Sequence, residues 1–359
     1  MDEWAPRWTA WDRDNVGLQI GNAGRSVRRI LVTLDVTDSV VTEALARRVQ
    51  LIVSHHPLLF RPLTSLTTAD PIGRLALRLA ENQVALFSAH TNLDAARDGV
   101  SFALARRLRL HNIRFLAPLR DMMAKIVVFV PHTHTSRVME AMARAGAGVI
   151  GQYTDCAFVS SGYGSFRGNA STNPFIGKPG QLEHANESRL EMVAPRARVE
   201  EVVRAMKAAH PYEEVAYDVY DLRTPDVNTG MGAVGELARA ETVRTFVNRL
   251  KRTLGVRSLR VAGSIARRVK RVAVCGGSGS ELIADAARAE VDVFVTADVR
   301  YHAFQHLPSA MMLMDAGHWE TERVVLPVIA QKLKAMARQR RTSLSVFVTE
   351  QITNPVRSL

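Results

Sequence analysis

Histidine and carboxylate side chains recur in this 359-residue sequence at positions that suit the binding of divalent metal ions. His55 and His56 stand side by side in SHHPLLF, directly after an apolar run. Asp94 ends the segment HTNLD, and His318 and Glu322 lie four residues apart in GHWETE. Imidazole and carboxylate ligands together suit borderline ions such as Zn, Fe or Mn. Five or so such ligands exceed a single closed tetrahedral site, whereas a site with two metal ions would use them all.

The adjacent histidines admit two arrangements. Neighbouring side chains on a continuing strand point to opposite faces, so His55 and His56 reach one ion only if the chain turns, as Pro57 favours. Otherwise each histidine addresses a different ion of a pair, with Glu322 available as a bridge. A site with two ions lowers the pKa of a bridging water and provides a nucleophile near neutral pH. For each histidine taken alone, the alternative is a hydrogen-bonded structural role.

Each of these clusters follows a segment that reads as a buried strand. Short apolar strands alternate with amphipathic helices at both ends of the chain, which is the rhythm of parallel α/β units. In such folds the carboxyl ends of the strands form the site, so the clusters are expected to meet there. The pattern predicts strands at 28–36, 51–54, 84–90, 271–277, 291–298 and 310–318, and helices at 38–50, 70–83, 280–290 and 320–339. Asp38 or Ser39 is expected near the cap of the helix at 38–50.

The middle of the chain follows a different order. Residues 122–222 read as strand, helix, two antiparallel strands, helix and strand, which is the ferredoxin-like order β-α-β-β-α-β. We therefore predict an α/β metal-binding domain formed from residues 1–121 and 223–359. A small α+β domain at 122–222 is inserted into it.

Further polar residues are candidates for acid–base chemistry. His90 precedes Asp94 by four residues, and is expected either to support a metal ligand or to act as a general base. Asp298 and His302 in TADVRYH follow another predicted strand, and a structural role is the alternative for both.

Two other segments have weaker chemical interpretations. The segment CGGSGS at 275–280 could cradle a phosphate at a helix N-terminus, but it lacks a Walker lysine, and a tight strand-to-helix turn is the preferred interpretation. In the inserted domain, His210, Tyr212 and Glu213 are expected to close a helix and begin a strand rather than to bind metal.

Composition narrows the class of protein. The net charge is +12, but the basic residues are scattered and only 7 of 47 are lysine, so nucleic acid is not the expected partner. Cys156 and Cys275 form neither a disulfide framework nor a zinc motif. The sequence has no apolar run of membrane-spanning length and no apolar signal segment, so a cytoplasmic protein without a membrane partner is expected.

The motifs together resemble the Ngg-interacting-factor-three-like family across nearly the whole chain. The segments that carry the resemblance are DNVGLQIG at 14–21, SHHPLLF at 54–60, HTNLD at 90–94, HPYEEVAYDVY at 210–220, CGGSGSELI at 275–283 and DAGHWETE at 315–322. In that family the corresponding residues bind two metal ions, which here implies His55, His56, Asp94, His318 and Glu322. Longer members carry an insert resembling the PII and CutA proteins, and the family forms ring-like hexamers. A homohexamer with a PII/CutA-like insert is therefore implied.

The resemblance leaves two functions open. Many bacterial members are described as GTP cyclohydrolase type 2 homologues or dinuclear metal centre proteins, which implies a metal-dependent hydrolase acting on a nucleotide. The alternative is a metal-binding protein without catalysis, in which the insert gates or scaffolds the ring. One departure concerns the N-terminus: members usually begin with a helix ahead of the DNVGL segment. This chain starts almost there, with Arg13 where Trp is common, as expected of a start codon assigned late.

Overall fold

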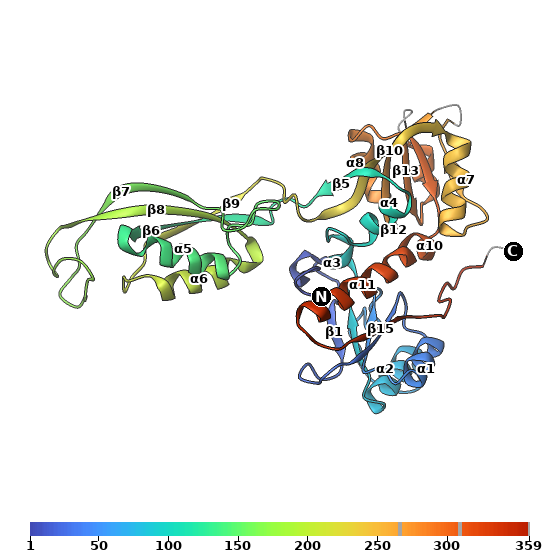
Figure 1. The fold of residues 1–359 in the computed structure, drawn as a ribbon, viewed down its shortest axis with the longest axis horizontal. Coiled ribbons are helices and arrows are strands. Elements are labelled where there is room, and N and C mark those ends of the chain that lie inside the picture. The colour runs from blue at the N-terminus through green and yellow to red at the C-terminus, as the bar shows by residue number, and fades with distance from the viewer. Residues whose placement is uncertain (265–267, 308–310, 358–359) are drawn as a thin grey trace. The chain divides into compact units, whose positions relative to one another are not determined.

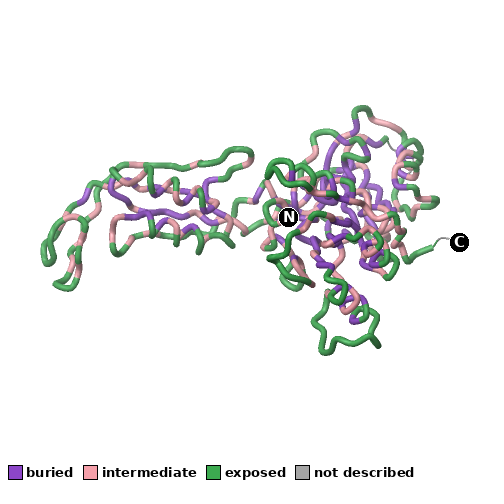
Figure 2. The backbone as a smooth tube through the Cα atoms, turned by 60° about the horizontal axis from the view of Figure 1, so that its bottom comes forward, coloured by how far each residue is buried: buried purple, intermediate pink, exposed green. Residues whose placement is uncertain are grey.

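Residues 1–264, 268–307 and 311–357 are described by a computed structural model of the chain (Figure 1). They form two compact units, one made of Met1–Ala117 with Thr229–Leu359 and the other of Pro118–Asn228. The insert boundaries expected from the sequence, 122 and 222, lie inside the second unit. Figure 2 shows that the buried stretches lie in the interior of each unit.

The first sheet of the larger unit comes mainly from the N-terminal segment. Among the described residues its strand order is β1-β4-β3-β2-β15. The four strands from β4 to β15 are parallel, whereas β1 is antiparallel to β4. The bounds are β1 Gly17–Ile20, β2 Arg29–Thr33, β3 Leu51–Ser54, β4 Ala85–Ser88 and β15 Ser345–Val348. Strands β1 and β15 are not among those predicted from the sequence.

Both faces of this sheet are buried, as expected for parallel strands. Alternate residues of the strands pack on α1 (Asp38–Ala46) and α2 (Pro71–Glu81) on one face, and on α11 (Leu326–Gln339) on the other. Helix α2 begins where Asp70 accepts a hydrogen bond from the Gly73 amide. Helix α1 is capped by Thr37, and Asp38, which was expected near the cap, is its first residue.

The second sheet of the larger unit comes mainly from the C-terminal segment. In the described part of the chain its order is β11-β14-β13-β12-β10-β5, with β12, β13 and β14 parallel. The bounds are β5 His111–Pro118, β10 Gly230–Thr242, β11 Arg260–Ala262, β12 Arg268–Ser278, β13 Val293–Ala297 and β14 Met312–Asp315. The strand predicted at 310–318 is therefore shorter, and its residue 310 lies outside the described residues.

Helices cover this second sheet as well. Phe102 and Phe246 are fully buried against one face, whereas Phe294 packs against the other beside Leu282. The bounds are α7 Val243–Leu254, α8 Ile283–Arg288, α9 Tyr301–Gln305 and α10 His318–Glu322. Short 3-10 turns stand at Arg7–Thr9, Ser280–Leu282 and Arg323–Val325. The helix predicted at 320–339 is thus divided into α10, a 3-10 turn and α11.

Helix α4 (Val100–Arg107) joins the two sheets of the larger unit. Its Phe102 and Leu104 belong to the core of the second sheet, whereas Val100 and Ala103 belong to the core of the first. The short helix α3 (Thr91–Asp94) precedes it and follows β4. Because α4 is buried on both sides, the carboxyl ends of the two parallel sheets are held near each other.

The second unit is a four-stranded antiparallel sheet with two helices on one face. Its elements follow the chain order β6, α5, β7, β8, α6, β9, and the strand order in the sheet is β7-β8-β6-β9. The bounds are β6 Met123–Pro131, α5 Thr135–Arg144, β7 Phe158–Phe166, β8 Glu183–Pro195, α6 Val199–Ala209 and β9 Tyr217–Leu222, with 3-10 turns at His132–His134 and Arg196–Arg198. Val128 and Leu190 are buried against Val138 of α5 and Val202 of α6.

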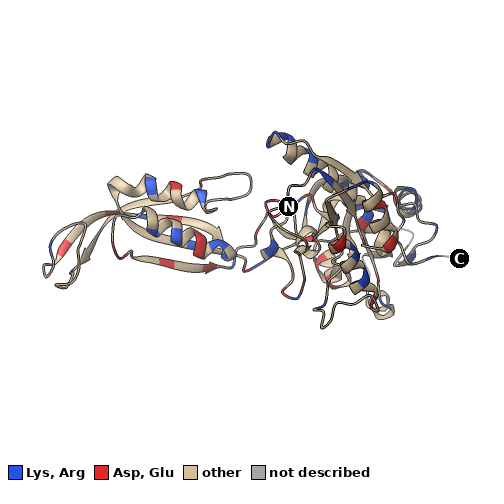
Figure 3. Cartoon of the chain, turned by 90° about the horizontal axis from the view of Figure 1, so that it is seen from below, with Lys and Arg blue, Asp and Glu red and all other residues tan. Residues whose placement is uncertain are grey.

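None of the helices among the described residues is both long and apolar enough to span a membrane. Lysine and arginine residues are distributed over the helices and loops of both units (Figure 3).

Candidate metal centre

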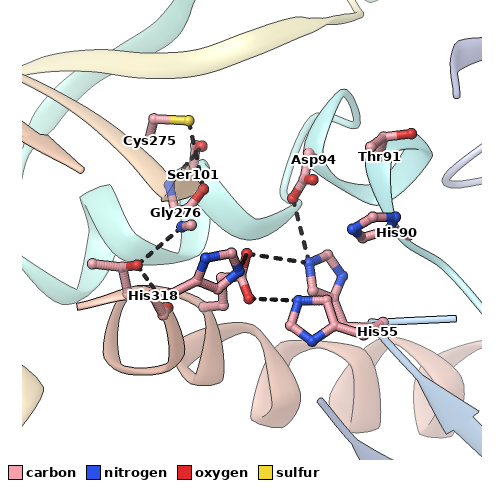
Figure 4. A network of polar contacts seen from close by, with 12 residues as sticks. His55, His90, Thr91, Asp94, Ser101, Cys275, Gly276 and His318 are labelled. Atoms are coloured by element: carbon pink, nitrogen blue, oxygen red, sulfur yellow. Dashed lines mark hydrogen bonds and ion pairs between the residues drawn. The ribbon is translucent and has the colours of Figure 1, made fainter. Parts of the chain in front are cut away.

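The histidines and carboxylates singled out in the sequence meet at the carboxyl ends of the parallel strands of the larger unit. His55 and His56 follow β3, and Asp94 ends α3 after β4. His318 and Glu322 begin and end α10, which follows β14. Figure 4 shows His55, Asp94 and His318 approaching one another from these separate elements.

The two adjacent histidines continue the strand and still lie in one cluster. The amides of His55 and His56 donate to the carbonyl oxygens of Thr33 and Leu34, at 3.0 and 2.9 Å. Their ring centroids are 4.9 Å apart, and the ring planes are inclined by 44°. His55 is fully buried, whereas His56 is partly exposed. The two imidazoles are therefore directed to neighbouring positions of the cluster.

Every histidine of the cluster is oriented through its Nδ1 atom. His55 Nδ1 lies 2.8 Å from the Ala89 carbonyl oxygen, which can only accept, so this nitrogen carries the proton. His56, His90 and His318 direct Nδ1 to the carboxylates of Asp35, Asp14 and Asp298, at 2.7, 3.0 and 2.6 Å. An Nδ1–H held by a carbonyl or carboxylate is typical of metal-binding histidines, because it leaves Nε2 available to the ion.

Glu322 stands at the centre of the Nε2 atoms. It is 3% exposed. Its Oε2 lies 2.9 Å from His56 Nε2, and its Oε1 lies 3.1 Å from His318 Nε2 and 3.7 Å from His55 Nε2. The i, i+4 spacing of His318 and Glu322 therefore places both side chains on one face of α10, as the sequence predicts. Asp94 Oδ1 lies 3.7 Å from His55 Nε2 on the other side.

These separations fit ligands around a metal ion. Ligand atoms at about 2.1 Å from a tetrahedral ion lie about 3.4 Å from one another, and the distances around Glu322 bracket that value. Among the described residues, His55 Nε2, Asp94 Oδ1 and Glu322 Oε2 are buried and have no hydrogen bond of good geometry. Buried polar atoms without such a partner are costly unless another group satisfies them. The cluster could therefore hold a metal ion.

Two overlapping triads are present in the described chain. The ligand atoms of His55, His56 and His90 lie within 4.8 Å of one another, and so do those of His56, His318 and Glu322. His90, expected to be catalytic or supporting, therefore lies close enough to be a ligand itself. Its ring centroid is 5.3 Å from that of His55 and 5.5 Å from that of His56.

The charges of the cluster shift its pKa values strongly in the absence of a metal ion. Burial alone would lower the pKa of His56, but the hydrogen bond to Asp35 and the nearby Glu322 carboxylate raise it to about 10. The hydrogen bond to Glu322 raises the pKa of His318 to about 9. Burial raises the pKa of Asp94 to about 7. The pKa of Glu322 falls well below its usual range, because the nearby histidines outweigh its burial.

Gly277 leaves room for the Glu322 carboxylate at the centre of the cluster because it has no side chain. Gly277 is the next-to-last residue of β12 and has a φ of 66°, and a Cβ atom there would overlap Glu322 Oε1. The neighbouring amides are used inside the protein: Gly276 N donates to Ser101 Oγ, and Gly277 N donates to Thr321 Oγ1. CGGSGS is therefore the end of β12 and the start of the following 3-10 turn, packed against the cluster, and these two amides do not face a phosphate.

The remaining sequence candidates separate into two groups. Asp298 belongs to the cluster, because it holds His318. His302 does not: it is exposed on α9, and its Nδ1 lies 3.2 Å from Gln305 of the same helix. In the second unit, His210 Nε2 lies 3.0 Å from the carbonyl oxygen of Phe129, where α6 ends, in keeping with a structural role.

Three residues that support the cluster were not among the site residues predicted from the sequence. Asp14 and Asp35 orient His90 and His56, and Thr353 donates to Asp35 Oδ2. The pKa of Asp14 falls to about 2, because hydrogen bonds from His90 and Thr91 outweigh its burial. Asp35 lies two residues beyond the end of β2, inside the strand predicted at 28–36. Asp14 precedes β1, and its one local sign is that it opens the segment DNVGLQIG.

Comparisons of the sequence and the structure with known proteins agree on one family. The profile of the Duf34/NIF3 (NGG1p interacting factor 3) family matches residues 1–355. Proteins named GTP cyclohydrolase 1 type 2 homolog are similar along 99% of this chain: that of Bacillus subtilis is 39% identical and 95% covered, and that of Mycobacterium tuberculosis is 38% identical and 94% covered. The crystal structure of a Bacillus cereus protein related to NIF3 is 36% identical, with a TM-score of 0.84, 100% of this chain and 96% of that chain covered. The chain therefore belongs to the Duf34/NIF3 family, as its motifs predict.

Proposed function

We propose that this chain binds two divalent metal ions, Zn, Fe or Mn, and is a metal-dependent hydrolase of the GTP cyclohydrolase type. The observation that carries the proposal is the shared orientation of four histidines. Each contacts a carbonyl or carboxylate oxygen through Nδ1. The Nε2 atoms of His55, His56 and His318 lie around the buried Glu322 carboxylate. The names of the curated relatives supply the reaction type.

The distances favour a division of the ligands between two ions. His55 and Asp94 would hold one ion, and His56 and His318 would hold the other. Glu322 would bridge them, since its two oxygens lie near histidines of both groups. Ions in such a site act as Lewis acids and activate water for attack near neutral pH.

His90 is the residue that we propose for proton transfer. Its Nδ1–H is held by Asp14, whose low pKa keeps that carboxylate ionised, so Nε2 is free to take or give a proton. The ring lies beside both His55 and His56 and is partly exposed. A nucleotide is the proposed substrate, on the strength of the relatives' names.

We infer the finer architecture from the same resemblance. The element order of Pro118–Asn228, and its strand order β7-β8-β6-β9, support an inserted ferredoxin-like domain of the PII/CutA type. A homohexamer is the proposed assembly, and light scattering during size-exclusion chromatography tests it. A monomer or dimer at micromolar concentration would contradict the hexamer.

The decisive experiment measures metal content and catalysis on one sample. Elemental mass spectrometry of the untagged protein is expected to give close to two ions per chain, and the same sample is expected to release formate from GTP. Two ions without formate release would reject the ring-opening reaction and favour a metal-binding protein without that catalysis. Metal near zero after reconstitution would reject the metal centre.

Variants separate the proposed roles. His56→Ala is expected to lower the metal content without unfolding the α/β core, and intact stoichiometry would remove His56 from the ligand set. His90→Gln is expected to keep two ions while turnover falls by about 10²–10⁴-fold, the usual contribution of a general acid or base. His302→Ala is the matched control, because it removes an exposed histidine outside the cluster. It is expected to change neither readout.

A further inference from the structure

The second unit carries a hollow that plays no part in the metal centre. Helices α5 and α6 cover one face of its sheet, and residues that alternate with the buried ones, such as Glu187 and Arg189, lie on the other face. On that open face lies a hollow of about 850 Å³, bounded by β7, β8, the segment 167–175 and the segment 212–216. This volume is in the range of sites that bind small molecules.

A glycine in β7 leaves space for the hollow because it has no side chain. Gly162 stands in the middle of the strand without a positive φ, and a Cβ atom there would meet no described atom within 4 Å. Neither backbone conformation nor packing therefore requires glycine at this position. Glycine weakens a strand interior, and its presence there often marks the close approach of another group.

Aromatic rings form one wall of the hollow. The ring centroid of Tyr212 lies 6.2 Å from those of Phe166 and Phe175. Phe175 is 53% exposed, so a large apolar surface on this wall is uncovered. Planar aromatic molecules are the ligands that such a wall favours, because rings stack with offset or edge-on geometry.

A carboxylate is fixed beside this wall. Glu187 lies on β8, partly buried, and its Oε1 accepts a hydrogen bond from the Tyr212 hydroxyl at 2.9 Å. The second oxygen, Oε2, lies next to Gly164, where a side chain would displace it. A fixed carboxylate accepts hydrogen bonds from N–H donors and gives them added strength through its charge.

The remaining charges disfavour a phosphorylated ligand. The lining contains Glu187, Glu213 and Glu214 but only two arginines. Arg167 donates to the Gly180 carbonyl oxygen, and Arg189 donates to Glu191 while its guanidinium lies over the Phe129 ring. Both guanidinium groups are thus engaged within the protein.

We propose that this hollow binds a planar nitrogen heterocycle of nucleoside size that carries N–H donors and no phosphate. The heterocycle stacks against Tyr212 and Phe175, donates to Glu187, and occupies the space above Gly162. The site is independent of the proposed hydrolase function, because its residues all lie in the second unit.

Isothermal titration calorimetry of the full chain tests the proposal with guanosine, guanosine monophosphate and purine riboside. Guanosine is expected to bind about tenfold or more tightly than purine riboside, whose base lacks N–H donors, because the lost hydrogen bonds involve a charged acceptor. It is also expected to bind more tightly than the monophosphate. Binding is expected to survive chelation of metal ions, which separates this site from the metal centre.

Two variants and their controls decide the location. Gly162→Leu fills the hollow and is expected to abolish guanosine binding while the melting temperature stays unchanged or rises; Val159→Leu on the same strand is its control. Glu187→Gln keeps an acceptor for Tyr212 and is expected to weaken guanosine about tenfold; Glu200→Gln on α6 makes the same charge change away from the hollow. Guanosine binding that is absent in the wild type, or undiminished in Gly162→Leu, overturns the proposal, as does tighter binding of the monophosphate.

Discussion

Binding of divalent metal ions to this protein is expected to release about two protons per chain at pH 7.5. Without metal, the pKa of His56 is raised to about 10 and that of His318 to about 9. Both imidazoles are therefore almost fully protonated at pH 7.5. A metal ion binds only the neutral imidazole, so each of the two ligands must lose a proton when the ions enter.

The direction in which metal affinity changes with pH follows from the raised pKa values of His56 and His318. Both pKa values are raised, so protons compete with metal at His318 below about pH 9 and at His56 below about pH 10. The apparent constant for filling the site is expected to rise by about 100-fold per pH unit between pH 7 and 8.5, because about two protons leave. The rise should flatten as the pH passes through 9 and then 10, where the two histidines are already neutral.

Calorimetric titration with manganese in buffers of different ionisation enthalpy measures the protons directly. The slope of observed enthalpy against buffer enthalpy is expected to be near two for the wild type and for the control His302→Ala. In Glu322→Gln the slope should fall, because the hydrogen bond to Glu322 is the largest contribution that raises the pKa of His318. A wild-type slope near zero would refute the reasoning, since it would mean that both histidines are neutral before metal binds.

Three substitutions test the supports of the cluster and the core. Gly277→Ala should lower the free energy of unfolding by about 1–3 kcal/mol and weaken metal binding, because its positive φ and the nearby Glu322 oxygen exclude a Cβ; urea denaturation and manganese titration would show neither change if the site can relax. Thr353→Val removes the hydroxyl that donates to Asp35 and should weaken metal binding by about tenfold in the same titration, whereas unchanged affinity would make this contact dispensable. Phe246→Ala should cost about 3–5 kcal/mol in urea denaturation while the metal content of the folded protein stays constant, since Phe246 is fully buried in the second sheet's core. A loss below 1 kcal/mol would mean that the core closes over the cavity.

The positions of the candidate metal ligands along the chain could be predicted because the pattern is local. A buried parallel strand reads as a short apolar run, and polar residues just beyond it fall at the carboxyl edge of the sheet. His55 and His56 follow this rule after β3, and Asp94 follows it after β4. The pairing of His318 with Glu322 needs only the period of one helical turn. None of these inferences depends on a distant contact.

The strand pairings and the hollow could not be predicted from any short stretch of the sequence. Strands β1 and β15 join the first sheet from opposite ends of the chain, and their registers depend on β4 and β2. The apolar rhythm also could not show that the N- and C-terminal strands form two sheets, because both sets have the same alternation. The hollow beside Gly162 depends on a loop packed over a sheet face, which no period in the sequence encodes.

By itself the sequence determined the family, the strand-and-helix rhythm and the residue types available for metal binding, since each of these depends on neighbours within about a turn or a strand. Only the tertiary structure decided that Asp14, Asp35 and Asp298 hold the Nδ1 atoms of His90, His56 and His318. These pairs are separated by 76, 21 and 20 residues. Each of these pairs joins the ends of two strands that are neighbours in one sheet. The packing of both sheets on α4 is what brings His55 and His56 of one sheet to Glu322 of the other, and that packing energy is summed over the whole core.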